Sequence, residues 1–131
     1  GFVAKINIEN NIICEIPYTG ISLGWGWTCS QNCMHDNRVY GNTIYHYAMH
    51  MYDTAGIYTL GAQPGTFISH NKVYGIYHPS YVHDPEHWFY LYTDEGSSGI
   101  TIKDNWTESE KYLKNANGPG NIWENNGRIK Q

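Results

Sequence analysis

The segment Ile68-Ser69-His70-Asn71-Lys72-Val73 carries the pattern that decides the fold: an aliphatic residue, two variable positions, an asparagine and a nearby apolar residue. The pattern recurs at intervals of 20 to 34 residues. Its copies are Ile8 to Asn11 with Ile13, Val39 to Asn42 with Ile44, Ile68 to Asn71 with Val73, Ile102 to Asn105 with Trp106, and Ile122 to Asn125. A repeated unit of this length predicts a stack of similar coils.

Short runs such as Ala4 to Ile8 and Gly99 to Lys103 alternate with a period of two, and each is too short to bury a face alone. A second motif falls at one phase of the long repeat, in Gly20 to Gly24, Gly56 to Leu60 and Phe89 to Thr93. Such strands must stack on equivalent strands of neighbouring repeats. The sequence therefore predicts an all-β fold, a right-handed parallel β-helix, for residues 1–131 as a single domain or a segment of one.

The repeated asparagine suits the turn between two strands of a coil. Asparagine tolerates left-handed backbone, and its amide can bond main-chain groups in a turn. Stacked amides can also bond to one another from coil to coil. An antiparallel sandwich also has many short strands, but it gives no reason for a fixed asparagine phase, so the β-helix is preferred.

Three segments interrupt the alternation and are expected to be insertions between coils: residues 25–36, 77–87 and 108–120. The last contains a short helical candidate, Ser109 to Lys114, followed by Asn117-Gly118-Pro119-Gly120. The chain begins directly in a strand, and an uncapped solenoid end exposes strand edges and apolar core. We therefore expect these coils to continue into further β-helix coils of a longer protein.

Composition excludes several classes of function. The net charge is −4 and the eight Lys and Arg residues are scattered, so no basic stripe is available for nucleic acid. The sequence lacks an apolar run of the roughly 20 residues that would span a bilayer. Cys14, Cys29 and Cys33 are an odd set, and Cys29-x-x-x-Cys33-x-His35 lacks a second ligand pair, so neither a disulfide framework nor a metal or other cofactor is expected.

Acidic, aromatic and imidazole side chains gather around the strands that share one phase. The candidates for the catalytic pair are Asp53 and Asp94, and the candidates for substrate binding are Trp25, Trp27, Tyr58, Gln63, His70, Trp88, Tyr92 and Glu95. Aromatic rings cover the apolar faces of sugars, while carboxylates and amides bind their hydroxyls. An oligosaccharide or polysaccharide is therefore the expected ligand. The polar stretch 83–88 is expected to wall the groove or to be a solvated loop.

The two aspartates lie at offset positions on strands of neighbouring coils. Coils are spaced about 4.8 Å apart, so the carboxyls are expected within about 5 to 10 Å, a range that includes the separations used by retaining and inverting glycosidases. One carboxyl would protonate the leaving oxygen, and the other would act as nucleophile or activate water. The alternative is that Asp53 and Asp94 only cap turns, that His70 is a turn residue, and that Trp25 and Trp27 plug the end of a coil.

Three stretches resemble a known family: Gly24 to Thr28, Asp53 to Thr66 and Tyr92 to Ser98. They are similar to hallmarks of bacterial parallel β-helix carbohydrate enzymes, closest to glycoside hydrolase family 141, over about residues 5–127. The resemblance implies a secreted or periplasmic enzyme of plant-polysaccharide breakdown, fucosidase-like or xylanase-like, whose catalytic aspartates fall on Asp53 and Asp94. The chain departs from the family at Thr54-Ala55, where Gly-Gly is usual, at Thr93, where Leu is usual, and in the inserted Cys29 to Cys33.

Two rival functions fit the same scaffold. A polysaccharide lyase would need Lys, Arg or Ca²⁺ to neutralise a uronate, and the expected face offers almost no basic residue. A carbohydrate-binding module would hold glycan on its aromatic residues without turnover.

Overall fold

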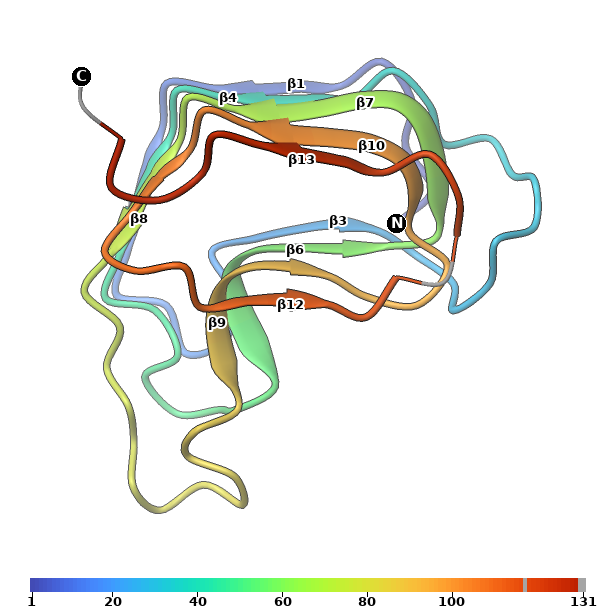
Figure 1. Cartoon of the computed structure of the whole chain (residues 1–131). Coiled ribbons are helices and arrows are strands. Elements are labelled where there is room, and N and C mark those ends of the chain that lie inside the picture. Colours follow the sequence, from blue (N-terminus) through green and yellow to red (C-terminus); the bar gives the residue numbers. More distant parts are fainter. Residues whose placement is uncertain (117, 130–131) are drawn as a thin grey trace.

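The computed structural model describes residues 1–116 and 118–129, and in these residues it contains thirteen strands and no helix. The strands form three sheets, and every strand pairing within them is parallel. Successive strands of the chain pass from one sheet to the next, so each turn of the chain adds one strand to each sheet (Figure 1). This architecture confirms the predicted parallel β-helix.

Each sheet is a ladder of strands from successive coils. The first sheet has the order β1 (Asn7–Glu9), β4 (Arg38–Tyr40), β7 (Ala62–Ser69), β10 (Ser98–Lys103) and β13 (Ile122–Glu124). The second has the order β2 (Ile12–Cys14), β5 (Thr43–Tyr45), β8 (Lys72–Tyr74) and β11 (Trp106–Thr107). The third has the order β3 (Ile21–Gly24), β6 (Thr54–Leu60), β9 (Trp88–Thr93) and β12 (Tyr112–Lys114).

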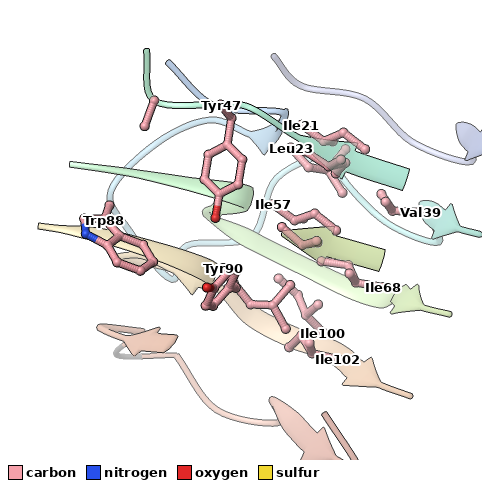
Figure 2. Close-up of a cluster of buried hydrophobic side chains, with 14 residues drawn as sticks. Ile21, Leu23, Val39, Tyr47, Ile57, Ile68, Trp88, Tyr90, Ile100 and Ile102 are labelled. Carbon is pink, nitrogen blue, oxygen red and sulfur yellow. The ribbon is translucent and has the colours of Figure 1, made fainter. Parts of the chain in front are cut away.

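The core consists of aliphatic columns that run along the stack. Val39, Ile68 and Ile102 are in register on the first sheet, and Ile57 pairs with Leu91 on the third. All five are at most 2% exposed, and Figure 2 shows the labelled isoleucines of these sheets converging on one interior. Burying a side chain of this size contributes about 1.5–3 kcal/mol. The alternating strands therefore stabilise the fold only as neighbours in a stack.

The predicted asparagine ladder exists and runs through all five coils. Each side-chain oxygen in the column accepts from the side-chain amide and the backbone N–H of the asparagine one coil before, at 2.8–3.2 Å, as in Asn42, Asn71 and Asn105. Its last member is Asn126, whereas the sequence pattern predicted Asn125. The predicted last copy was therefore shifted by one residue. Trp123, and not Ile122, pairs with Ile102 and packs on the core, and Ile122 is 52% exposed.

The left-handed residue of this corner is the one before the ladder asparagine. Positive φ angles fall on Asn10, Gly41, His70, Asp104 and Asn125, and none falls on the ladder asparagines. The tolerance of asparagine for left-handed backbone is therefore not used at the ladder positions themselves. The ladder position favours asparagine for its amide, because the carboxamide accepts two hydrogen bonds through its oxygen and donates two through its nitrogen, as at Asn71.

The predicted helix Ser109 to Lys114 is also wrong. Residues Tyr112–Lys114 form β12, which pairs with β9 through Tyr112 and Leu91. Tyr112 packs against the core from there. An open strand edge and an apolar face override a weak local helix preference, and Asn117 of the following turn lies outside the described residues.

Candidate active site

The strands β6 and β9 are bent, and the bend positions the candidate site. Figure 1 shows each strand rising from the long loops of the fold and then turning to run along the third sheet. Asp53 lies directly before β6, where its N–H donates to the carbonyl of His87 at 2.8 Å. Asp94 lies directly after β9, where its N–H donates to the carbonyl of Thr59 at 3.0 Å. The acids thus lie at opposite ends of adjacent bent strands.

Tyrosines fill the outer side of this bend. Tyr58 and Tyr92 are in register on β6 and β9, and their rings meet edge to face with centroids 4.8 Å apart. They belong to a cluster with Ala55 and Leu60 that is distinct from the aliphatic core. Because their strand neighbours Ile57 and Leu91 point inward, the two tyrosines point outward. The outer face of the third sheet therefore carries a buried aromatic patch.

Asp94 is covered by side chains of this patch and is 7% exposed. Tyr58 donates its hydroxyl to Oδ2 of Asp94 at 2.5 Å, and Asn115 donates its amide to Oδ1 at 2.8 Å. A buried carboxylate needs such donors, because an unpaired one is costly to desolvate. Asp94 therefore lies beneath outer side chains and not in the solenoid core.

Asp53 is the exposed member of the pair, with 55% of its side chain accessible. Its Oδ1 accepts from the hydroxyl of Tyr92 at 3.2 Å, and Nε2 of His87 lies 3.0 Å from the same oxygen. Its backbone φ is 53°, which aspartate tolerates better than most residues. The carbonyl of Asp53 accepts from the hydroxyl of Tyr18 at 3.0 Å.

Tyr92 links the two acids. Burial raises the pKa of the Tyr92 phenol, and the nearby carboxylates of Asp94 and Asp53 raise it further through charge and hydrogen bonding. Burial and the hydrogen bond to Asp94 also raise the pKa of Tyr58. Burial raises the pKa of Tyr18, and the charges of Asp53 and Asp94 add to this effect against an opposing hydrogen bond with Thr19. The phenols therefore stay protonated, so Tyr58 can donate to the carboxylate of Asp94, Tyr92 to that of Asp53 and Tyr18 to the backbone carbonyl of Asp53.

These raised values predict a loss of stability at alkaline pH. A tyrosine whose folded pKa exceeds the unfolded value of about 10 contributes stability that is fully present below that pH and is lost as the pH rises toward the folded value. The loss approaches about 1.4 kcal/mol per pH unit for each such phenol. Denaturant unfolding between about pH 8 and pH 11 should show this fall for the wild type.

Two variants test the assignment to the buried phenols. Tyr58→Phe removes one titrating phenol and should make the fall with pH shallower. Tyr81→Phe is the matched control, because Tyr81 is 70% exposed, and it should leave the slope unchanged. Equal slopes in all three proteins would contradict the assignment.

Trp25 and Trp27 follow the end of β3 and form an exposed pair. Their rings meet edge to face with centroids 5.0 Å apart, and the side chains are 51% and 53% exposed. Gly24 and Gly26 have φ of 98° and 92°, so the segment is a glycine-dependent turn. Gly24 pairs with Leu60 in the sheet, which places the pair at the Asp94 end of the third sheet. Exposed Glu95 lies at the same end.

Three predicted binding residues lie away from this surface. Gln63 is 0% exposed, and its amide donates to the carbonyls of Leu23 and Leu60, so it holds a turn and cannot reach a ligand. Trp88 is 9% exposed and packs in the core (Figure 2). His70 occupies the left-handed corner position between the first and second sheets and packs on Tyr40, as its alternative interpretation required.

Three side chains at the acids had no assigned role in the sequence. His87 was expected only as part of a groove wall, whereas Tyr18 and Asn115 were not singled out at all. Tyr18 comes from the turn before β3, and Asn115 follows β12. One signal was available for Asn115: it is two residues beyond the β12 partner of Tyr92, just as Asp94 is two beyond Tyr92 itself.

Other features of the described residues lie elsewhere. A hollow of about 520 Å³ lies beside the β3–β4 loop and is lined in part by Met34, Ala62, Pro64 and Ser98. Within residues 1–116 and 118–129, no group of three or more His, Cys, Asp or Glu is placed to hold a metal ion. No described helix is long and apolar enough to cross a membrane.

One solved structure, described as "Glycoside hydrolase", matches 96% of the chain with 66% sequence identity and a TM-score of 0.93. The chain is similar to part of a glycoside hydrolase. It spans 21% of the length of that protein. No protein-family model and no curated protein matches the chain.

Proposed function

We propose that this chain forms the acid-bearing face of a glycoside hydrolase, with Asp53 and Asp94 as its carboxylate pair. The observation that carries the proposal is that two adjacent tyrosines bond the two acids, Tyr58 through Oδ2 of Asp94 and Tyr92 through Oδ1 of Asp53. The two acids are 41 positions apart in the sequence, and each contacts one of two neighbouring tyrosines on the third sheet. The similarity to a glycoside hydrolase over nearly the whole chain supports the same reaction class.

The two carboxyls differ in access, which suits different roles. Asp53 is exposed and can meet water or sugar, whereas Asp94 is held by Tyr58 and Asn115. In hydrolysis the glycosidic C–O bond breaks, one carboxyl gives its proton to the leaving oxygen, and the other either bonds the anomeric carbon or takes a proton from the attacking water. Water supplies the new hydroxyl in both cases.

The substrate we propose is a plant-type oligosaccharide or polysaccharide, fucosylated or xylan-like. The exposed Trp25–Trp27 pair offers ring faces to the apolar side of a sugar at the Asp94 end. A polymer of this kind is met outside the cell, so we propose a secreted or periplasmic location. The direct test incubates the natural polypeptide that contains these residues with fucosylated and xylan-type glycans and follows new reducing ends by chromatography. Unchanged glycans of both classes would refute the proposed substrate class.

Replacing the tryptophans should weaken substrate binding. Trp25→Ala or Trp27→Ala should raise KM roughly tenfold, which corresponds to about 1.4 kcal/mol, with kcat little changed. Trp106→Ala, on the second sheet, is the matched control and should leave KM unchanged. Michaelis–Menten kinetics on the preferred oligosaccharide measures both constants. A KM that rises equally in all three variants would show that the tryptophan pair is not a sugar platform.

A carbohydrate-binding module is the second candidate, and one observation favours it. Both oxygens of Asp94 accept hydrogen bonds from protein side chains, and the residue is 7% exposed. In that case glycan would bind with unchanged composition after long incubation, and Asp53→Asn would leave affinity unaltered. Calorimetric titration together with product analysis distinguishes the two functions.

A further inference from the structure

The environment of Asp53 differs between its two carboxyl oxygens. Oδ1 accepts the Tyr92 hydroxyl at 3.2 Å and lies 3.0 Å from Nε2 of His87. Both contacts come from the coil after Asp53, one from β9 and one from the loop before it. The described side-chain contacts of this carboxyl are thus on Oδ1, while more than half of the side chain is accessible.

His87 is fixed by contacts that do not involve the carboxylate. Its N–H donates to the carbonyl of Asp84 at 3.2 Å, and its own carbonyl accepts from the N–H of Asp53 at 2.8 Å. Its ring meets the ring of Phe89 edge to face, with centroids 5.1 Å apart. The backbone thus joins His87 to Asp53, and the packing on Phe89 sets the direction of the imidazole.

Titratable side chains from several elements lie near the His87 imidazole. Asp53 lies before β6, and the Tyr92 ring of β9 lies 6.4 Å from the imidazole. Glu86 is its neighbour in the chain and pairs with Lys111 at 3.6 Å, and Nζ of Lys111 lies 5.8 Å from the ring of Phe89. Asp53 is the carboxylate in direct contact with the imidazole, at 3.0 Å from Nε2.

We propose that His87 is a positioning residue that holds Oδ1 of Asp53 and leaves Oδ2 as the reactive oxygen. The inference rests on the proposed glycoside hydrolase function, since it assigns one atom of that pair its role. A carboxylate clamped through one oxygen presents the other in a fixed direction. Small errors in such alignment cost large factors in rate, up to about 100-fold for 1 Å.

The kinetic test uses His87→Ala, His87→Gln and His83→Ala in the natural polypeptide. His87→Ala should lower kcat about tenfold with KM within about twofold, because His87 contacts Asp53 and not the sugar. His87→Gln restores a polar group of similar reach and should recover part of kcat. His83→Ala removes an exposed imidazole of the same loop that packs on Tyr52, and it should match the wild type. An unchanged kcat in His87→Ala, or an equal loss in His83→Ala, would overturn the proposal.

A second measurement tests the contact between His87 and Asp53 even if no glycan is hydrolysed. The ¹⁵N signals of the His87 imidazole should differ between the wild type and Asp53→Gly, while those of His83 stay the same. Glycine is chosen because it adopts the positive φ of residue 53 without strain. Unaltered His87 signals would refute the contact. Altered signals without turnover in the wild type would support the contact and reject the hydrolase function instead.

Discussion

Asp53→Asn and Asp94→Asn should each lower kcat by roughly 10³-fold, the largest effects on activity that we expect. Positioned proton transfer contributes about 10²–10⁴-fold, and loss of a nucleophilic carboxylate is at least as severe. An amide keeps the shape of the side chain but can neither carry the proton nor attack. The measurement is the rate of reducing-end release from the preferred oligosaccharide, compared with the wild type at equal folded concentration.

The two aspartates need different checks on folding. Asp53 has a φ of 53°, so Asp104→Asn, at a φ of 55° on another corner of the coil, is its matched control and should retain full activity. Asp94 is buried, and an amide there faces the donors of Tyr58 and Asn115, so we expect a loss of about 1–3 kcal/mol in stability as well. Circular dichroism and thermal unfolding separate this loss from the loss in rate. Near-normal turnover in either folded variant would remove that aspartate from the mechanism.

The sequence contains enough information for the architecture because the repeat has a direct physical meaning. An aliphatic column and an asparagine column each require the same residue type at the same place in every coil, and both columns are found. The last copy was misassigned because Asn125 and Asn126 are identical in chemistry. One is the left-handed residue and the other is the ladder residue, and only the strand register of Trp123 distinguishes them.

Only those features of the candidate site that depend on the alignment of strands between coils could be predicted from the sequence. Phase placed the β6 and β9 segments at equivalent positions of neighbouring coils, where they pair, and it predicted that Asp53 and Asp94 would share a face. It did not show the bend of β6 and β9, which lets a tyrosine bridge acids at opposite strand ends. Nor did it show which residues near the strands point inward, so buried Gln63 was grouped with exposed side chains.

The positions of loop residues cannot be predicted from the periodicity of the sequence. His87 reaches Asp53 because the 77–87 insertion returns to the coil next to residue 53, and no repeat fixes the length or path of an insertion. Trp25 and Trp27 show the same limit, since two glycines with positive φ set the course of the chain there. Fold therefore follows from repeated residues, whereas parts of the candidate site depend on residues that break the repeat.

Asn71→Ala should cause the largest loss of stability that we expect from a single polar substitution, on the order of 3–5 kcal/mol. Asn71 is 1% exposed, and its side chain accepts from Asn42 and donates to Asn105 and to the carbonyl of Val39. Alanine would remove the acceptor of the Asn42 N–H and of one N–H of its amide, and one donor to the carbonyl of Val39, at about 1–3 kcal/mol for each group left unsatisfied in a dry interior. The measurement is the free energy of unfolding in urea, with a fall in Tm on the order of 10 °C.

The position of each asparagine in the ladder supplies the control. Asn126→Ala removes a terminal member that is only partly buried, so water can replace some of its bonds and the loss should be about half as large. Asn125→Gly changes the exposed residue beside it, whose amide bonds Asp104, and should cost less than about 1 kcal/mol because glycine retains the positive φ. Stability therefore should fall in the order Asn125→Gly, Asn126→Ala, Asn71→Ala. Equal losses at residues 71 and 125 would mean that side-chain bonding along the column does not stabilise the coils, and that the backbone pairing of the sheets alone holds the stack.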